Sequence, residues 1–244
     1  MDLLNSKNYI PQVAVDFVVF GYENHQLKVL VSKLNFQGDF YTLQSGFIKQ
    51  EEDLDDAAKR ILEERTGIKG IYLEQFKVFG KANHKRKEFI DELISSNFSY
   101  SEASHKSNLK AYKWFIKRFL SIGYYSLVDM KKVIPKLTSF DAEINWYSVH
   151  EVPKLIMHYD EVLAEALDAI KADIDQKHNA FNLLPEKFTM KEIQQVYETI
   201  FDHKYIRSNF QKKILEMNAL ERLEKKYTGA KNKAPYLYKL KETQ

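Results

Sequence analysis

A 23-residue stretch from Gly46 to Ile68 constrains the fold of this chain more than any other feature. It reads GFIKQEEDLDDAAKRILEERTGI, a glycine-containing loop followed by an amphipathic segment. Apolar residues recur at helical spacing from Leu54 to Leu62, and Gly67 is a helix stop signal. The pattern predicts a loop, a helix and a second loop between strands. This is the outline of a phosphate-handling element.

The first 177 residues read as a body of strands closed by a helix. Strand-like runs recur at 13–22, 26–34, 39–47, 70–80, 118–129 and 143–152. The first two predict a hairpin, and the third predicts a short strand that runs into a loop. The polar, basic segment 81–117 predicts a helix and a mobile loop inserted between strands. An amphipathic helix is expected over 161–177.

The pattern changes in the last sixty residues. A helix is predicted to begin at Thr189, which forms a capping box with Glu192. After a short turn, residues 206–217 predict a second helix, with Phe210, Ile214 and Leu215 able to pack inward. Residues 220–240 predict two strands around a basic loop. Helix, turn, basic helix and basic hairpin is the plan of a winged helix-turn-helix.

Charge divides at the same place. Residues 187–244 hold thirteen Lys and Arg against seven Asp and Glu, a net charge of +6, whereas the preceding residues carry −3. A basic segment beside a mildly acidic body is typical of a nucleic-acid-binding module. A basic surface that is merely solvated is the alternative.

Composition excludes several classes of protein. The chain has no cysteine, which rules out disulfides and thiolate sites. It has no apolar run of eighteen residues, and its N-terminus lacks the features of a signal peptide. A cytoplasmic protein with no membrane partner is therefore expected.

The stretch 46–68 resembles the Nudix box, in which a Gly, a Glu, an Arg-Glu pair and a Glu-Glu pair follow one another at fixed spacing before a final glycine. The positions that match are Gly46, Glu52, Arg60, Leu62, Glu64, Gly67 and Ile68. The resemblance implies an α+β chain whose first domain is a Nudix α/β/α sandwich.

The resemblance does not extend to the chemistry. Nudix enzymes hold a divalent metal with three carboxylates on one helix face, and those positions are Ile61, Glu64 and Arg65 here. A lone carboxylate beside a cation cannot assemble the oxygen ligands that Mg²⁺ requires. We therefore expect no catalytic residue, no metal and no cofactor. Glu64 is expected to pair with Arg60 or Arg65, with metal binding as the alternative.

Five residues are candidates for contact with a ligand, on the loop, the helix and the segment before the last helix of the body: Gln44, Ser45, Gly46, Glu64 and His158. Gln44 and Ser45 stand where the enzymes carry proline and glycine, and they add hydrogen-bonding groups. Both could equally be ordinary loop residues. His158 either lines the cleft or packs at the start of the helix, and packing is favoured.

Both halves together resemble the Nudix-related transcriptional regulators, which join a decayed Nudix domain to a C-terminal winged helix. The broken box AAKRILEERTGI, WYSVHEVPKLIMHYDEVLAEAL and FNLLPEKFTMKEIQQVYETIF carry the resemblance. It implies an effector-binding and dimerisation domain over 1–176 and a DNA-binding domain over 177–244. It also implies a homodimer and an effector that is ADP-ribose or a sugar. The insertion near 81–117 exceeds the family's usual connection.

The second helix and the loop of the hairpin carry side chains suited to DNA. Arg reads guanine, Asn and Gln read adenine, and Lys suits phosphates. The candidates are Arg207, Ser208, Asn209, Gln211, Lys212, Lys213, Lys225, Lys226, Lys231 and Lys233. A basic surface that contacts another protein is the alternative.

Three functions follow from these observations. The first is a DNA-binding regulator that responds to a small molecule. The second is a Nudix hydrolase of a nucleoside diphosphate linked to another moiety, and the third is a protein-interaction adaptor. The loss of two carboxylates argues against the second, and the order of the C-terminal elements favours the first.

Overall fold

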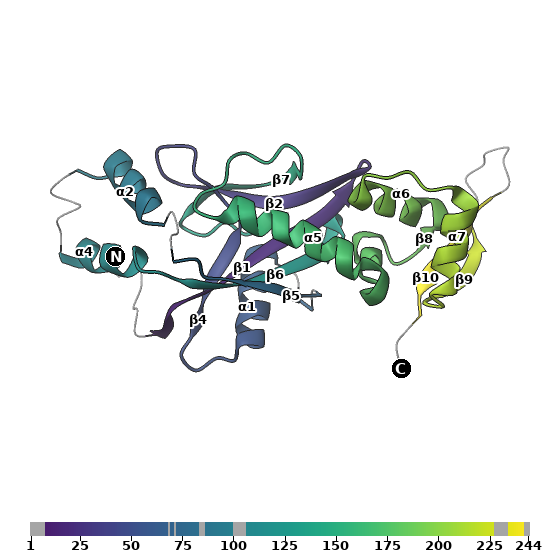
Figure 1. Cartoon of the computed structure of the whole chain (residues 1–244), viewed down its shortest axis with the longest axis horizontal. Coiled ribbons are helices and arrows are strands. Elements are labelled where there is room, and N and C mark those ends of the chain that lie inside the picture. Colours follow the sequence, from purple (N-terminus) through teal and green to yellow (C-terminus); the bar gives the residue numbers. More distant parts are fainter. Residues whose placement is uncertain are drawn as a thin grey trace.

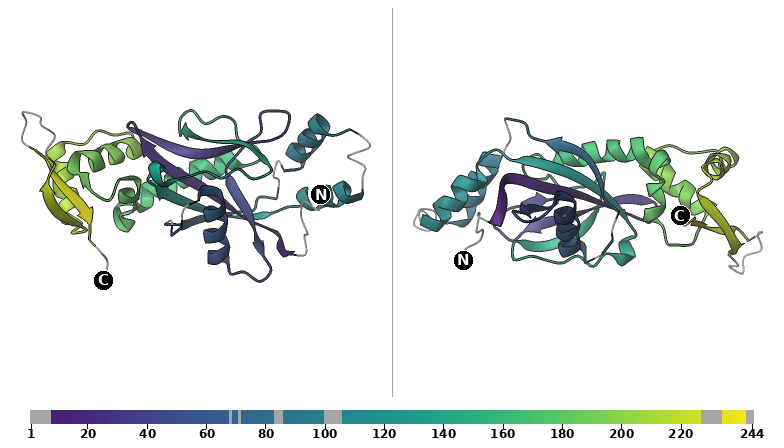
Figure 2. Two further views of the ribbon diagram at one scale, coloured as in Figure 1. Left: turned by 180° about the vertical axis from the view of Figure 1, so that it is seen from behind. Right: turned by 90° about the horizontal axis from the view of Figure 1, so that it is seen from below.

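The computed structural model describes residues 8–67, 69–70, 72–82, 86–99, 106–226 and 234–241. A mixed sheet with helices on both faces forms the body, and a smaller unit of helices and a three-stranded sheet follows it (Figure 1). The insertion helices lie at one end of the body and the smaller unit at the other, as two further views confirm (Figure 2). No described helix combines the length and the apolar character needed to cross a bilayer.

The long strand β1 (Tyr9–Glu23) organises the sheet of the body. In the described residues the order is β3 (Tyr41–Thr42), β2 (Gln26–Leu34), β1, β6 (Leu120–Val128) and β5 (Glu74–Phe79), with β4 (Gln44–Lys49) paired to β1 and β7 (Asp141–Ser148) paired to β2. β1 runs parallel to β6. Its first part pairs antiparallel with β4 and its last part pairs antiparallel with β2. Asn24 and His25 both have positive φ at the tip of the predicted β1–β2 hairpin, as a tight two-residue turn requires.

Residues 44–49 form the strand β4, which begins within the predicted strand-like run 39–47 and continues where the sequence predicted a loop, so the prediction of a loop was wrong. β4 pairs antiparallel with β1, bringing Gly46 opposite Val15 and Ser45 opposite Asp16. The segment Gln-Ser-Gly has little intrinsic preference for a strand, and the pairing with β1 imposes one.

The described residues of the insertion form two helices, α2 (Arg86–Asn97) and α4 (Lys106–Phe115), where one helix and a mobile loop were predicted. Residues 100–105, which lie between them, are outside the described residues. α4 is anchored by Trp114, whose ring packs against Phe47 of β4 and Phe119 at centroid separations of 5.0 and 4.9 Å. This aromatic contact comes from segments far apart in sequence, which explains why helical periodicity alone missed α4.

Two helices cover opposite faces of the sheet. The predicted helix α1 (Leu54–Thr66) buries Ala57, Ala58, Ile61 and Leu62 and ends at Gly67, which has a φ of 74°. The other face is covered by α5 (Tyr159–Lys177), the second helix that the sequence predicted. The body is thus a three-layer sandwich of helix, sheet and helix (Figure 1).

The smaller unit follows the predicted order of elements. A short 3-10 helix η3 (Asn179–Leu183) leads into β8 (Phe188–Thr189), α6 (Met190–Phe201), α7 (Arg207–Glu216), β9 (Leu220–Lys225) and β10 (Tyr236–Leu240). The capping box of Thr189 and Glu192 is present at the start of α6. β8 was not predicted; it pairs with β10 at the edge of the small sheet.

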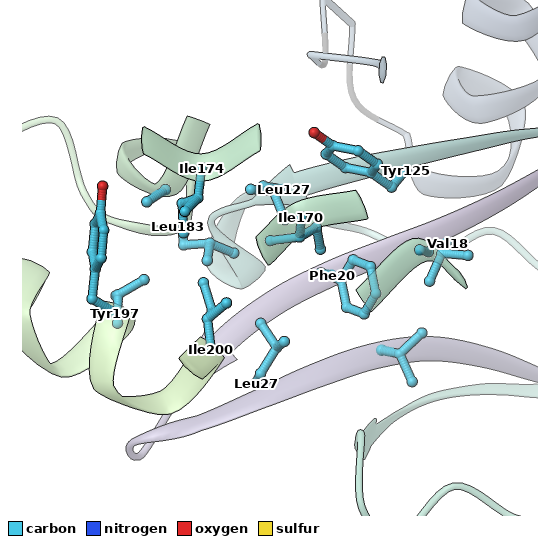
Figure 3. Close-up of a cluster of buried hydrophobic side chains, with 14 of the residues drawn as sticks. Val18, Phe20, Leu27, Tyr125, Leu127, Ile170, Ile174, Leu183, Tyr197 and Ile200 are labelled. Carbon is cyan, nitrogen blue, oxygen red and sulfur yellow. The ribbon is translucent and has the colours of Figure 1, made fainter. Parts of the chain in front are cut away.

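One apolar cluster runs from the sheet of the body into the smaller unit. Figure 3 shows Leu27 of β2 and Ile170 of α5 in the same cluster as Ile200 and Tyr197 of α6. All four side chains are almost fully buried. The two units therefore share a core, and the burial of each depends on the other.

We expect the shared core to make the two units unfold together. Ile200→Ala in α6 should lower the free energy of unfolding by about 2–5 kcal/mol, because a buried aliphatic side chain leaves a cavity. The chain has only two tryptophans, Trp114 and Trp146, and both lie in the body. Urea unfolding followed by tryptophan fluorescence should therefore report the loss.

Leu215→Ala is the matched control, because Leu215 is a large apolar residue of the smaller unit that is 44% exposed. It should shift the transition little. A tryptophan-detected transition that Ile200→Ala leaves unchanged would show that the units unfold independently.

Candidate functional site

The five residues expected to contact a ligand do not meet in one place. Because β4 is a strand, its side chains alternate between the two faces of the sheet. Gln44 and Gly46 face α1, where they contact Arg65 and Ile61. Ser45 points to the other face, toward Tyr159 at the start of α5.

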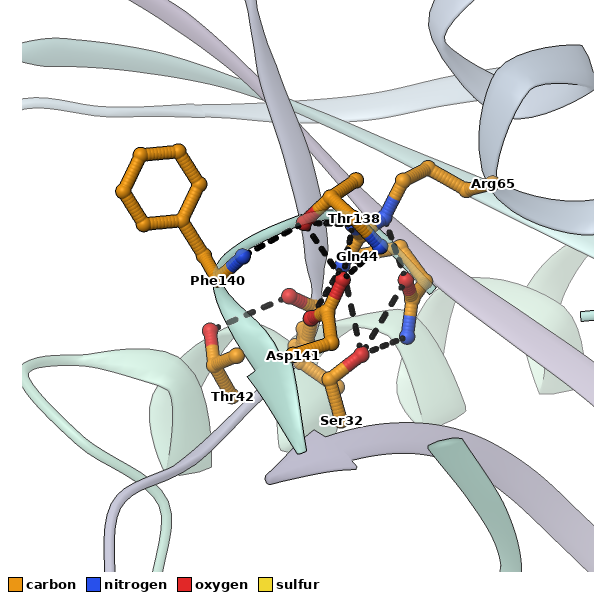
Figure 4. A network of polar contacts seen from close by, with 8 residues as sticks. Ser32, Thr42, Gln44, Arg65, Thr138, Phe140 and Asp141 are labelled. Atoms are coloured by element: carbon orange, nitrogen blue, oxygen red, sulfur yellow. Dashed lines mark hydrogen bonds and ion pairs between the residues drawn. The ribbon is translucent and has the colours of Figure 1, made fainter. Parts of the chain in front are cut away.

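Arg65 lies at the centre of a buried polar network on the α1 face (Figure 4). Its guanidinium donates to both carboxylate oxygens of Asp141, at 2.7 and 3.0 Å. The remaining donors reach Gln44 Oε1 at 2.8 Å and Ser32 Oγ at 3.2 Å. The network joins α1 to β2, β4 and the start of β7.

Because this ion pair is buried, its stability depends on good hydrogen-bond geometry. Arg65 and Asp141 are 8% and 7% exposed. Burial alone would raise the pKa of the Asp141 carboxyl, but hydrogen bonds from Arg65 and Thr138 outweigh it and the pKa is lowered. The bidentate contact and the further bonds compensate the desolvation of both charges.

Ile61 fills the space beside the glycine of the box. It is 3% exposed, and its side chain lies against Gly46 so closely that a Cβ on Gly46 would be 2.7 Å from Ile61 Cγ2. Gly46 is therefore required for the close approach of the helix, and no polar ligand group stands at position 61.

Glu64 pairs with Arg60, which confirms one of the two expected partners. The Arg60 guanidinium lies 3.2 Å from Glu64, one helical turn away. It also contacts Glu52 at 2.6 Å and donates to the carbonyl oxygen of Phe47 at 3.1 Å. The hydrogen bond from Arg60 lowers the pKa of Glu52. Within the described residues, no group of three or more His, Asp or Glu is placed to hold a metal ion.

A second buried polar cluster lies on the α5 face. Asp16 on β1 accepts hydrogen bonds from the hydroxyls of Ser121 and Tyr159. Burial and the nearby Asp16 carboxylate raise the pKa of Tyr159. His158 Nε2 lies 3.7 Å from Asp16, and its ring packs against Phe79 at 5.8 Å. His158 thus packs at the start of α5, as favoured, and shares this cluster with Ser45.

An open cleft of about 600 Å³ lies between the β2–β3 connection and the start of β7. Its lining includes Lys33, Asn35, Phe36, Asp39 and Glu143, and none of the five predicted ligand residues. The insertion borders the β2–β3 connection, because the amide and carbonyl groups of Gln37 bond to Asn97 of α2. No sequence pattern predicts this cleft, since its walls come from two segments, 33–39 and 142–143, that are far apart along the chain.

The second helix of the smaller unit presents polar side chains to solvent. Arg207, Ser208 and Asn209 at its N-terminal end are exposed, as is Lys212. Gln211 is half-buried. Leu215, expected to pack inward, is instead 44% exposed. Phe210 and Ile214 face the core one turn apart, and Leu215 lies about 100° further around the helix.

Several of the predicted DNA-contacting lysines already have partners within the protein. Lys213 Nζ lies 2.7 Å from Asp175 of α5, and Lys226 Nζ lies 3.1 Å from Glu192. Lys225 lies over the ring of Tyr236 at 5.5 Å. Lys231 and Lys233 lie outside the described residues. Contact of these lysines with DNA stays a prediction.

Arg222, a basic residue of the hairpin, was not among the candidates named from the sequence. Arg222 on β9 is exposed and lies 4.7 Å from the centre of the Tyr236 ring on β10. The alternation along β9 places Arg222 beside an aromatic ring on the neighbouring strand. Only the register of the two strands brings them together.

Removing one partner of the buried pair should be strongly destabilising. Asp141→Asn should lower the free energy of unfolding at neutral pH by about 3–5 kcal/mol, because Arg65 keeps its charge in a buried site. The folded-state pKa of Asp141 is depressed, so its contribution is present above the unfolded value near 4 and is lost as the pH falls through the folded value.

Urea unfolding at neutral pH and at successively lower pH should therefore show a difference between wild type and variant that shrinks on acidification. Glu143→Gln, an exposed carboxylate on the same strand, is the control and should change stability little. A difference that does not depend on pH would contradict the role given to the charge.

Comparison with known proteins places both units. Residues 180–240 match the family described as the NrtR DNA-binding winged helix domain. The chain is 23% identical over 230 residues to the ADPR responsive transcriptional repressor NtrR of Acinetobacter baylyi, covering 92% of this chain and 80% of that protein.

Crystal structures of Shewanella oneidensis NrtR, alone and with a 27mer DNA, match over 94% of both chains with TM-scores of 0.68 and 0.69 at 21% and 20% identity. The fold is thus a Nudix domain followed by a winged helix, as the sequence predicted. The chain thus resembles the Nudix-related regulators, which join a Nudix-like domain to an NrtR-type winged helix.

Proposed function

We propose that this protein is a transcriptional regulator that binds operator DNA through its winged helix and senses a metabolite through its Nudix-like domain. The observation that carries the proposal is the exposed N-terminal end of α7. Arg207, Ser208 and Asn209 lie side by side there, where a recognition helix contacts base edges. Within the described residues, Arg207 forms no ion pair that would compete with DNA.

The effector that we propose is an ADP-ribose-like metabolite. The support is the name of the Acinetobacter baylyi relative, an ADPR responsive repressor. A sugar is the alternative that the same family resemblance allows. Ser45 and His158, which share the buried cluster around Asp16, remain candidates for effector contact, as do Gln44, Gly46 and Glu64.

Contacts between the two units suggest how effector binding in the body would influence the DNA-binding surface of the smaller unit. Thr199 of α6 donates to the carbonyl oxygen of His25 at the tip of the β1–β2 hairpin, at 3.2 Å. On the other side Lys213 of α7 pairs with Asp175 of α5. We therefore assign Lys213 an orienting role: it fixes the angle of α7 relative to the body.

A homodimer completes the proposal, because a winged helix that reads one half-site gains affinity and specificity from a second. We propose that the Nudix-like domains form the contact between subunits. The protein then acts as a binding protein and not as a hydrolase, since Ile61 packs against Gly46 and Arg65 is engaged by Asp141.

Two kinds of substitution should separate base reading from phosphate contact. Arg207→Ala and Asn209→Ala should each cost about 1–3 kcal/mol of binding free energy and relax preference at particular base pairs. Lys212→Ala should weaken all sequences alike and flatten the salt dependence, because one counterion fewer is released. Salt titrations on the upstream region of the gene and on random duplex measure both effects.

Lys59→Ala, on an exposed lysine of α1, is the charge-matched control and should leave binding unchanged. Equal affinity for the two duplexes would favour the protein-contact role for the basic surface.

ADP-ribose should bind without being consumed and should change operator affinity by a coupling free energy of about 1–3 kcal/mol. Calorimetry, a DNA-binding titration with and without ADP-ribose, and a product assay with Mg²⁺ or Mn²⁺ form the measurement, with arabinose as the second ligand. Turnover near ~1 per second that Glu64→Gln abolishes would overturn the proposal and favour a hydrolase.

A further inference from the structure

Ile206 presents a large apolar side chain to solvent beside the polar residues of α7. It is 70% exposed and occupies the N-cap position of the helix. Arg207, Ser208 and Asn209 follow directly, and Asn209 lies three residues on, on the same side of the helix. Ile206 is therefore an apolar side chain within the surface proposed to read base edges.

The turn before α7 holds Ile206 in place. Glu198 accepts a hydrogen bond from the Tyr205 backbone N–H at 3.0 Å, and Gln194 donates to the Tyr205 carbonyl oxygen at 3.0 Å. The Tyr205 ring packs against Phe210 at 5.4 Å, so Tyr205 points inward and Ile206 points outward. The carbonyl oxygen of Ile206 accepts from the Phe210 N–H, which fixes its backbone in the first turn. The exposed side chain is thus preorganised.

Isoleucine is a poor residue for this position if only stability matters. Ser, Thr, Asp and Asn are preferred at an N-cap because their oxygen accepts from the first N–H groups of the helix, and Ile supplies no such oxygen. Among the described residues, α7 accordingly has no side-chain cap at Ile206. An exposed apolar side chain that also leaves helix donors uncapped favours a role outside the isolated fold.

We propose that Ile206 is a specificity-determining residue that packs against the 5-methyl group of a thymine in each operator half-site. The inference deepens the proposed function and rests on it. In the major groove only thymine presents a methyl group, and apolar side chains recognise it by contact. In this proposal Arg207 and Asn209 donate or accept hydrogen bonds at purine edges. Ile206 recognises the thymine methyl group, which polar side chains cannot recognise by hydrogen bonding.

The test replaces thymine by deoxyuridine, which removes the methyl group and keeps every hydrogen bond of the base pair. A duplex is first selected from a random library with the full-length protein, and each thymine of a half-site is then replaced in turn. At one position the replacement should weaken wild-type binding by about fourfold, as expected for one buried methyl group. Ile206→Ala should weaken binding to the selected duplex at least as much. Replacing thymine by deoxyuridine at that one position should not weaken the binding of this variant further, whereas replacements at the other thymines should affect variant and wild type alike.

Leu215→Ala is the matched control, because Leu215 is an exposed aliphatic residue of the same helix at its other end. It should keep the deoxyuridine effect of the wild type. If the losses of binding free energy caused by Ile206→Ala and by deoxyuridine simply add at every thymine, the inference is overturned. The proposed function is left standing by that result. If the selection enriches no sequence, the proposed function fails, and the inference fails with it.

A second variant separates recognition from a structural role. Ile206→Ser should raise the melting temperature, because serine can cap α7, and should lower the affinity for the selected duplex. A lower melting temperature in both Ile206 variants would show that the side chain stabilises the fold. If Ile206→Ala dissociates the oligomer in light scattering without changing affinity per site, Ile206 belongs to a contact between subunits, which also overturns the inference.

Discussion

A buried guanidinium must find oxygen partners for its N–H groups, and in this protein that constraint holds the Nudix-like domain together. Arg65 satisfies it with both oxygens of Asp141 and with Gln44 and Ser32. These partners fix α1 against three strands. A carboxylate at position 65 would face Asp141 across the same space and would repel it. The interior of the domain is therefore built around a buried cation, the Arg65 guanidinium.

A second tight contact lies one turn earlier on α1. Ile61 lies so close to Gly46 that even a Cβ at position 46 would clash with it. Both substitutions in the box thus have structural roles, and together they make helix α1 part of the core. The apolar cluster that continues through α5 and η3 into α6 links the body to the winged helix.

Local signals in the sequence were reliable where the structure depends on local chemistry. The capping box at Thr189 and Glu192, the stop at Gly67 and the periodicity of α1, α5 and α6 all act within a few residues. The full extent of β4 and the helix α4 were missed because each is stabilised by a distant segment, β1 in one case and the rings of Phe47 and Phe119 in the other. Because β4 is a strand, Ser45 lies on the face of the sheet opposite Gln44, which the interpretation of these residues as a loop did not predict.

The sequence by itself determined the order of the elements, the basic character of the last sixty residues and the presence of Ile61 and Arg65 at two positions where the resemblance implies carboxylates. Each of these follows from residue identity and short-range spacing. Only the tertiary structure decided what the replaced residues do, because Asp141, the partner of Arg65, lies 76 residues further along the chain. It also decided which basic residues of the winged helix are occupied within the protein, since Lys213 meets Asp175 only when α7 packs beside α5. Pairings between distant segments arise from packing geometry, and spacing along the chain carries no record of them.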